Sequence, residues 1–179
     1  MVISFLSGVI GAGMAAFVTF RTSRSKMAAE IQARWDAALL EQSRELAEAA
    51  RSLRHHTLNV ARGIELDGSR QRLDTAHERL RVTVEQLRLV GSLRVQGAAR
   101  LVLFHVYAMR VQLEEGHDPR AADFPGTTPI GRLNDALQEF YRAVRQQLRV
   151  PDSEGVLHND SLGGLVANAA DQPIRPETL

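Results

Sequence analysis

The feature that most constrains this chain is an apolar run from Val2 to Phe20, followed at once by a basic cluster. The run has no charged residue, and its length of about 19 residues is close to the roughly 20 that a helix needs to cross a bilayer. The basic cluster is Arg21, Arg24 and Lys26, which the positive-inside rule holds in the cytoplasm. We therefore expect a single-pass membrane anchor with its N-terminus outside and the rest of the chain cytoplasmic.

Two other interpretations of the run stay open. A cleavable signal peptide begins with a basic segment, whereas here only Met1 precedes the run. Ala12-Gly13-Met14 is nevertheless a weak cleavage motif, and cleavage would make this a secreted helical protein. A buried core helix is the other alternative, although core helices rarely run this far without a charge.

Small residues recur every fourth position along the expected anchor. They form two rows, Ser7, Gly11 and Ala15 in one, and Gly8, Ala12 and Ala16 in the other. Such rows allow membrane helices to approach closely, so they predict a homo-oligomer that pairs through the anchor. The alternative is that Gly and Ala are simply common in membrane helices.

Composition excludes several classes of protein. Lys and Arg together number 22 and Asp and Glu 21, so no bulk positive field recruits nucleic acid. The absence of Cys excludes disulfides and thiolate sites. Aromatic residues are only 5% of the chain, which disfavours a β-rich fold.

The segment after the anchor has helical periodicity from Ser25 to about Arg62, without Gly or Pro before Gly63. This predicts a long, stalk-like helix with Trp35 in the base of a bundle core. One apolar stripe follows its larger residues: Ile31, Trp35, Leu39, Leu46, Leu53 and Val60.

Three further amphipathic helices are predicted, at Ser69–Val90, Leu93–Glu115 and Pro129 to about Val150. Ser69 and Thr128 are the expected N-caps. Gly and Pro residues between the last two helices predict a loop. We predict an all-α fold in which an antiparallel bundle of three or four helices follows the transmembrane and stalk-like helices. The domains are then an anchor at 1–22, a cytoplasmic bundle at 23–150 and a disordered tail at 151–179.

No residue pattern predicts catalysis or a metal or cofactor site. Histidines and carboxylates lack the helical spacing of a metal site, and His105 is expected as a core histidine. The acidic residues near the loop could form an acid or metal pair, but a solvated helix end is the simpler interpretation. These residues are Glu114, Glu115, Asp118 and Asp123.

The order of parts resembles a loose class of uncharacterised actinobacterial single-pass membrane-anchored helical proteins. The resemblance covers about residues 2–151 and depends on the segment Val84–Ser92 and on Phe140–Arg145 before a Leu-Arg-Val-Pro boundary. It implies a bacterial cell membrane location but no activity and no active-site residue. This chain lacks the strongly basic first helix that such proteins often have.

The function expected from these observations is a non-enzymatic, membrane-tethered helical interaction or scaffold module with a protein partner. A small membrane-associated enzyme or ligand-binding helical bundle is the alternative. That alternative requires a polar pocket near His105, Tyr107 and Tyr141.

Overall fold

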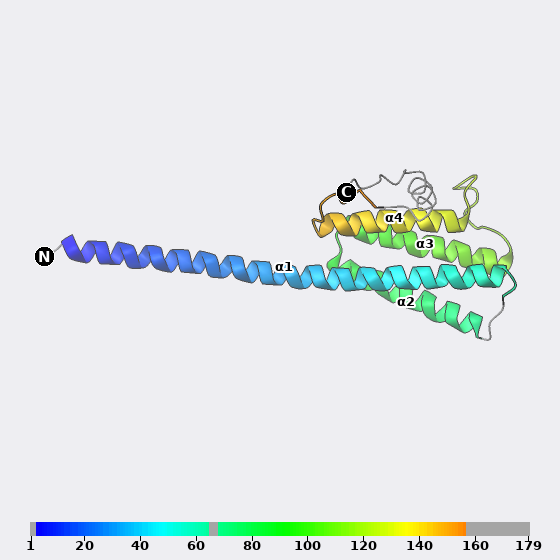
Figure 1. Ribbon diagram of the computed structural model, residues 1–179, viewed down its shortest axis with the longest axis horizontal. Coiled ribbons are helices and arrows are strands. Elements are labelled where there is room, and N and C mark those ends of the chain that lie inside the picture. The colour runs from blue at the N-terminus through cyan, green and yellow to red at the C-terminus, as the bar shows by residue number, and fades with distance from the viewer. Residues whose placement is uncertain (1–2, 65–67, 157–179) are drawn as a thin grey trace, which may run out of the picture. The chain divides into compact units, whose positions relative to one another are not determined.

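The computed structural model describes the backbone of residues 3–64 and 68–156, and the side chains of residues 24–64, 68 and 70–156. These described residues contain four helices and no strand, which confirms the all-α class for this part of the chain (Figure 1). The helices are α1 (Ile3–Ala61), α2 (Ser69–Val90), α3 (Leu93–Glu115) and α4 (Pro129–Gln147). The chain divides into two compact units, Met1–Ala38 and Leu39–Leu179.

The predicted anchor and tail fall largely outside the described residues. This applies to the side chains of residues 2–20, with both rows of small residues, and to the tail from residue 157 onward. Where the structure describes the chain, no helix has a long enough apolar stretch to span a membrane.

The helix ends follow the Gly, Ser, Thr and Pro residues of the sequence. Both α2 and α3 have the predicted limits, and Ser92 caps α3 by accepting a hydrogen bond from the Val95 N–H at 3.4 Å. Thr128 caps α4 as predicted, because its hydroxyl accepts from the Gly131 N–H at 3.1 Å. The predicted N-cap of α2, Ser69, was wrong, because Gly68 occupies the N-cap position and provides no side chain.

Helix α4 ends at Gln147, three residues before the predicted limit. Arg149 takes a positive φ of 57°, and the Val150 N–H donates to the Arg145 carbonyl at 2.9 Å. This is the hydrogen-bond pattern with which a left-handed residue terminates a helix. Pro151 therefore follows a helix that has already ended.

The unit Leu39–Leu179 is an antiparallel four-helix bundle whose fourth member is the part of α1 from Leu39 onward. Polar contacts join the start of one helix to the end of the next: the Ser92 N–H donates to Gln147 Oε1 at 2.7 Å, and Arg110 lies 2.7 Å from Asp74. Helices α3 and α4 approach each other most closely. Their buried residues include alanines on both helices, which permit short interhelical distances. These alanines are Ala98, Ala99, Ala136 and Ala143.

The core is aliphatic, with Phe140 as its one fully buried aromatic side chain among the described residues. The predicted inward stripes of α2, α3 and α4 supply most of it, and α1 adds three fully or almost fully buried leucines. The α1 leucines are Leu39, Leu46 and Leu53. Hydrophobic burial of this continuous core is the main stabilising term of the bundle.

The prediction that Trp35 lies in the bundle core was wrong. Trp35 is 51% exposed and Ile31 49%, and both belong to the unit Met1–Ala38, whereas the buried part of the same stripe begins at Leu39. Helical periodicity reports which face of a helix is apolar. It does not report how far along that face the neighbouring helices extend.

Candidate functional site

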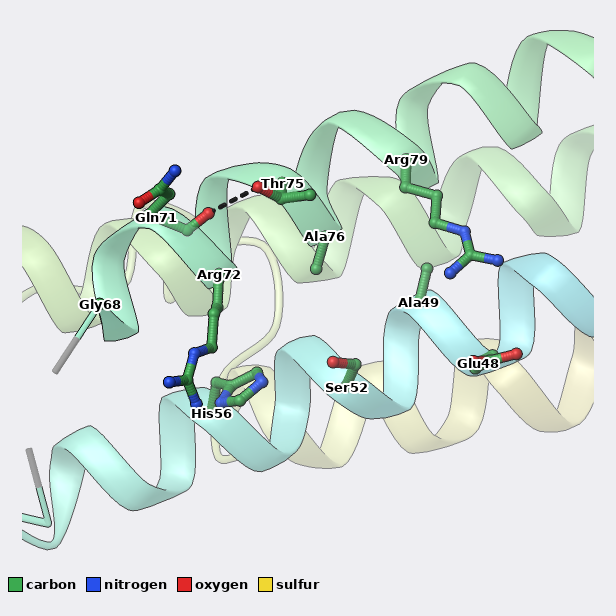
Figure 2. A pocket seen from close by; sticks show the side chains of 10 residues that line it. All are labelled: Glu48, Ala49, Ser52, His56, Gly68, Gln71, Arg72, Thr75, Ala76 and Arg79. Atoms are coloured by element: carbon green, nitrogen blue, oxygen red, sulfur yellow. Dashed lines mark hydrogen bonds between the residues drawn. The ribbon is translucent and has the colours of Figure 1, made fainter. Parts of the chain in front are cut away.

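An open groove between α1 and α2 is one of several concave features of the described bundle. It encloses about 550 Å³, within the range of small ligand sites. Figure 2 shows Arg72, Ala76 and Arg79 of α2 extending toward α1, whereas Gln71 and Thr75 lie on the side of α2 that is turned away from α1 in this view. The lining residues are Glu48, Ala49, Ser52 and His56 of α1, with Gly68, Gln71, Arg72, Thr75, Ala76 and Arg79 around them.

The groove follows from helical spacing on both walls. Ala49, Ser52 and His56 are separated by three and four residues, so they lie on one face of α1 beside the buried stripe. Ala76 occupies the facing part of α2. Small side chains on both helices leave space at the floor of this seam, whereas longer side chains form its rim.

The two ends of the groove carry different chemistry. At one end, Arg79 of α2 forms an ion pair with Glu45 of α1, with 3.6 Å between Nη2 and Oε1. At the other end, Arg72 extends from α2 across to the imidazole of His56, one turn beyond Ser52 (Figure 2). The end of the groove that contains Gly68 is therefore lined by a guanidinium and an imidazole, with the Ser52 hydroxyl further along α1.

This end of the groove is also the beginning of α2. The first turn of α2 contains no acidic residue and its N-cap makes no side-chain hydrogen bond, although helix N-termini favour negative charge. Arg70 and Arg72 lie in that turn instead. Arg70 lines a different cavity, with Val60 and Asp74.

A buried ion pair lies at the other side of the bundle, between α4 and the loop that follows α3. Arg132 Nη2 is 2.9 Å and 2.8 Å from the two carboxylate oxygens of Asp118. The side chains are only 3% and 10% exposed. Arg132 also donates to the Thr127 carbonyl at 3.0 Å. A single arginine thus connects both ends of the loop to α4.

Aromatic rings surround this ion pair. The His105 ring lies 5.3 Å from the Phe124 ring and 5.5 Å from the Phe104 ring, both in edge-on arrangements. The Arg120 guanidinium stacks 3.9 Å above the Phe104 ring, as cations do on aromatic faces. The loop is therefore packed against α3 by rings as well as attached to α4 by charge.

The two titratable groups in this cluster have lowered pKa values. Burial lowers the pKa of His105, and the charges of Arg132 and Arg120 lower it further, against smaller opposing effects of Asp118 and Asp135. Burial alone would raise the pKa of Asp118, but hydrogen bonds from the Arg132 guanidinium and the Arg120 N–H outweigh it. The Asp118 pKa therefore lies below its ordinary value, and the carboxylate stays charged beside Arg132.

The structure separates the residues of the polar pocket considered from the sequence. His105 is buried, as expected for a core histidine. Tyr107 is 55% exposed and lines a groove of about 580 Å³ with His77 and Arg100, whereas Tyr141 packs against the core. The three side chains thus have three different environments.

The acidic residues near the loop also differ from one another. Glu114, Glu115 and Asp123 are exposed, as a solvated helix end requires. That interpretation was wrong for Asp118, which is almost completely buried by its ion pair. Within the part of the chain that the structure describes, no group of three or more His, Asp or Glu residues could hold a metal ion.

Sequence analysis did not identify the groove residues Ser52, His56, Arg72 and Arg79. A helical-face comparison of α1 and α2 contained part of the signal, because small residues flank the buried stripe on both helices. Which faces meet depends on the tertiary arrangement, which one sequence does not specify.

Comparisons with known proteins identify no relative of this chain: no protein-family model, no curated protein and no solved structure matches it.

Proposed function

We propose that this chain is a non-enzymatic, membrane-tethered helical interaction module that holds a protein partner in the α1–α2 groove. The observation that carries the proposal is the contrast between a buried, continuous aliphatic core and an open groove on the same bundle. Ala49 belongs to that core and Ala76 packs against it, whereas the other groove residues lie outside the core.

The groove has the features of a protein-binding surface. Its floor of Ala49 and Ala76 admits an apolar group, and its rim supplies charged and amide side chains such as Glu48, Gln71 and Arg79. Interfaces commonly combine an apolar centre with a polar rim. A membrane tether would add to this by raising the local concentration of the module for a partner at the same membrane.

Site-specific photo-crosslinking in the native host tests the use of the groove. A photoreactive residue replacing Gln71, at the groove, should give a discrete crosslinked species with the partner. The control replaces Gln112, which is exposed on α3. Equal crosslinking from both positions, or none from Gln71, would contradict the proposal.

The groove-filling variant Ser52→Leu provides a second arm of the same experiment. The hydroxyl of Ser52 lies in the groove (Figure 2), and leucine is the better helix former. The larger side chain should remove the crosslink from Gln71 while the bundle stays folded. A crosslink that persists at full yield would mean that the partner does not enter the groove.

The tether itself is the second part of the proposal, with the N-terminus outside and the bundle cytoplasmic in a bacterial cell. It is supported by the uncharged run Val2–Phe20 and the basic cluster Arg21, Arg24 and Lys26. A reporter active only in the cytoplasm should be active when fused after Leu179. Activity there of a reporter that works only outside the membrane would reverse the topology.

Self-association through the anchor is the third part. Gly11 is central in the row Ser7, Gly11 and Ala15, where a bulky side chain would separate two helices. Gly11→Ile should weaken association in a membrane two-hybrid assay, and Val9→Ile should not. Equal association of both variants and the parent would show that the small-residue rows do not mediate pairing.

A further inference from the structure

We infer that the loop between α3 and α4, residues 116–128, is released by protonation of His105 while the helices of the bundle stay packed. His105 lies on α3 and is only 5% exposed, and the loop contributes the Phe124 ring that packs against it. The inference does not depend on the α1–α2 groove, because this loop is attached to α3 and α4 instead. Release would uncover buried rings, so the surface that the bundle presents would change with pH.

The loop is attached to the bundle through very few of its residues. All of its residues except Asp118, Arg120 and Phe124 are exposed, and these three do not belong to the aliphatic core. A segment with few buried apolar contacts can open locally without unfolding of the core. Gly116 and Gly126 lie on either side of the three residues with φ of 76° and 77°, and a glycine backbone rotates with little steric restriction. The loop can therefore move away once these three attachments are lost.

Two of the attachments depend on the rings around His105. The Phe124 ring lies edge-on at 5.3 Å from the imidazole, and the Arg120 guanidinium stacks on Phe104, whose ring lies 5.5 Å from the same imidazole. His105 Nδ1 is buried and has no hydrogen-bond partner among the described residues. A protonated imidazole carries a hydrogen on both ring nitrogens. Protonation would therefore make Nδ1 a buried, charged donor without an acceptor among these groups.

The third attachment is the ion pair between Asp118 and Arg132, and it leaves little negative charge to balance a second cation. Both carboxylate oxygens of Asp118 contact Arg132, at 2.9 Å and 2.8 Å. Burial lowers the pKa of His105 most, Arg132 and Arg120 lower it further, and the carboxylates of Asp118 and Asp135 oppose them less strongly. Helix α3 has no other charged side chain within one turn of His105. A protonated His105 is therefore better accommodated when the loop has moved away and water reaches the ring.

The direction of the pH dependence follows from the two arrangements of the loop. In the attached arrangement the pKa of His105 lies below 6.5, whereas a solvated imidazole has about that ordinary value. The released arrangement thus binds a proton that the attached one resists, so its population should rise as the pH falls below 6.5. One proton changes the ratio of released to attached loop by at most about tenfold per pH unit.

Hydrogen exchange of the full-length chain in non-ionic detergent, on both sides of pH 6.5, tests the release. Two loop amides report it: the Arg120 N–H donates to Asp118 Oδ1 at 2.9 Å, and the Phe124 N–H donates to the Arg120 carbonyl at 3.2 Å. After correction for intrinsic exchange, their protection should fall by up to about tenfold per pH unit. The amide of the buried Val106 in α3 should stay protected. Parallel loss at Val106 would mean that acid unfolds the bundle, and constant protection of the loop amides would mean that no release occurs. Either result would overturn the inference.

His105→Phe and His77→Phe are a matched pair for the same measurement. The pKa of His77 is also lowered by burial, but its neighbouring cations are Arg110 and Arg81 rather than residues of the loop. His105→Phe should abolish the pH dependence of loop protection, and His77→Phe should leave it within about twofold of the parent. The opposite pattern would contradict a role of His105.

The parent protein provides a second readout that requires no substitution at His105. Its imidazole resonances should titrate over the same pH range in which the loop amides lose protection. If His105→Phe does not fold, this comparison decides, and titration of His105 in a separate pH range would reject the inference.

Discussion

Helices α3 and α4 meet along one seam of the bundle, and α1 and α2 meet along another. The two seams differ in how closely their helices pack. At the α3–α4 seam the helices approach closely, buried alanines fill the core side, and the following loop is fixed by Arg132 and Asp118. At the α1–α2 seam a cavity of about 550 Å³ stays open, and the Arg79–Glu45 ion pair crosses it at the rim. Small residues therefore close one seam and open the other.

The difference shows that what surrounds a small residue decides its effect. Ala99 and Ala143 are buried within the continuous core, where their size lets two backbones approach. Ser52 and Thr75 lie beside the core, where long neighbouring side chains project to solvent. In the first case a small side chain increases packing, and in the second it leaves a groove. Most of the core and the proposed binding surface thus lie in separate parts of the same bundle.

The largest expected effect on stability comes from the closely packed α3–α4 side of the bundle. Phe140 is fully buried in α4, so Phe140→Ala should lower the free energy of unfolding by about 3–5 kcal/mol. The control is Tyr107→Ala, because Tyr107 is 55% exposed and should change stability by at most about 0.5 kcal/mol. Chemical denaturation followed by circular dichroism measures both. Equal effects would remove Phe140 from the core.

The buried ion pair should be similarly sensitive. Asp118→Ala leaves Arg132 buried without its carboxylate partner, which should cost about 3–5 kcal/mol of unfolding free energy. Glu85→Ala breaks the Arg88–Glu85 pair, which has the same 2.8 Å separation but side chains 60% and 66% exposed. That control should cost at most about 1 kcal/mol. Adding Arg132→Leu to Asp118→Ala should recover stability, and a further large loss would argue against the pair as the cause.

Acidification should lower the free energy of unfolding of the bundle through His105, which lies beside the Arg132–Asp118 ion pair. Its pKa is lowered from 6.5 in the folded protein, so below that pH the unfolded chain binds a proton that the folded chain resists. Stability should therefore fall as the pH drops below 6.5, with a slope of at most about 1.4 kcal/mol per pH unit from this one group. His105→Phe should flatten this part of the pH profile in denaturation experiments, although His77, whose pKa is also lowered, retains its share. An unchanged profile would exclude His105 as a source.

Asp118 should affect the stability of the bundle in a separate and more acidic pH range. Its pKa is lowered in the folded protein, so its stabilising contribution is complete above the ordinary value of 3.8 and is lost as the pH falls below it. Profiles of Asp118→Asn and His105→Phe should therefore diverge from the parent in different pH ranges. Coincident changes would mean that the two groups titrate as one unit.

Helix positions were the part of the fold most accessible from the sequence. Gly91, Ser92, Gly116 and Thr128 are local signals, and each determines a helix end through its own backbone or side-chain geometry. Trp35 shows where local signals fail, since the apolar stripe extends beyond the residues that the bundle buries. Burial depends on the neighbouring helix, which periodicity does not contain.

The candidate site was less accessible for the same reason. His56 and Arg72 have no distinctive spacing within their own helices, and they line one groove only because of how α1 and α2 meet (Figure 2). Asp118 and Arg132 are 14 residues apart, a distance at which neither residue gives a periodic signal for the other. Long-range polar contacts must be read from the tertiary structure.

The central claim, that one seam is closed and the other open, is tested most directly by a matched pair of substitutions to leucine. Ala99 is fully buried, so Ala99→Leu should overpack the core and lower the unfolding free energy by about 1–3 kcal/mol. Ser52→Leu should change it by at most about 0.5 kcal/mol, because the α1–α2 groove has space for the added atoms. Chemical denaturation of both variants beside the parent provides the measurement. An equal loss of stability in Ser52→Leu would contradict the open groove, and with it the proposed binding surface.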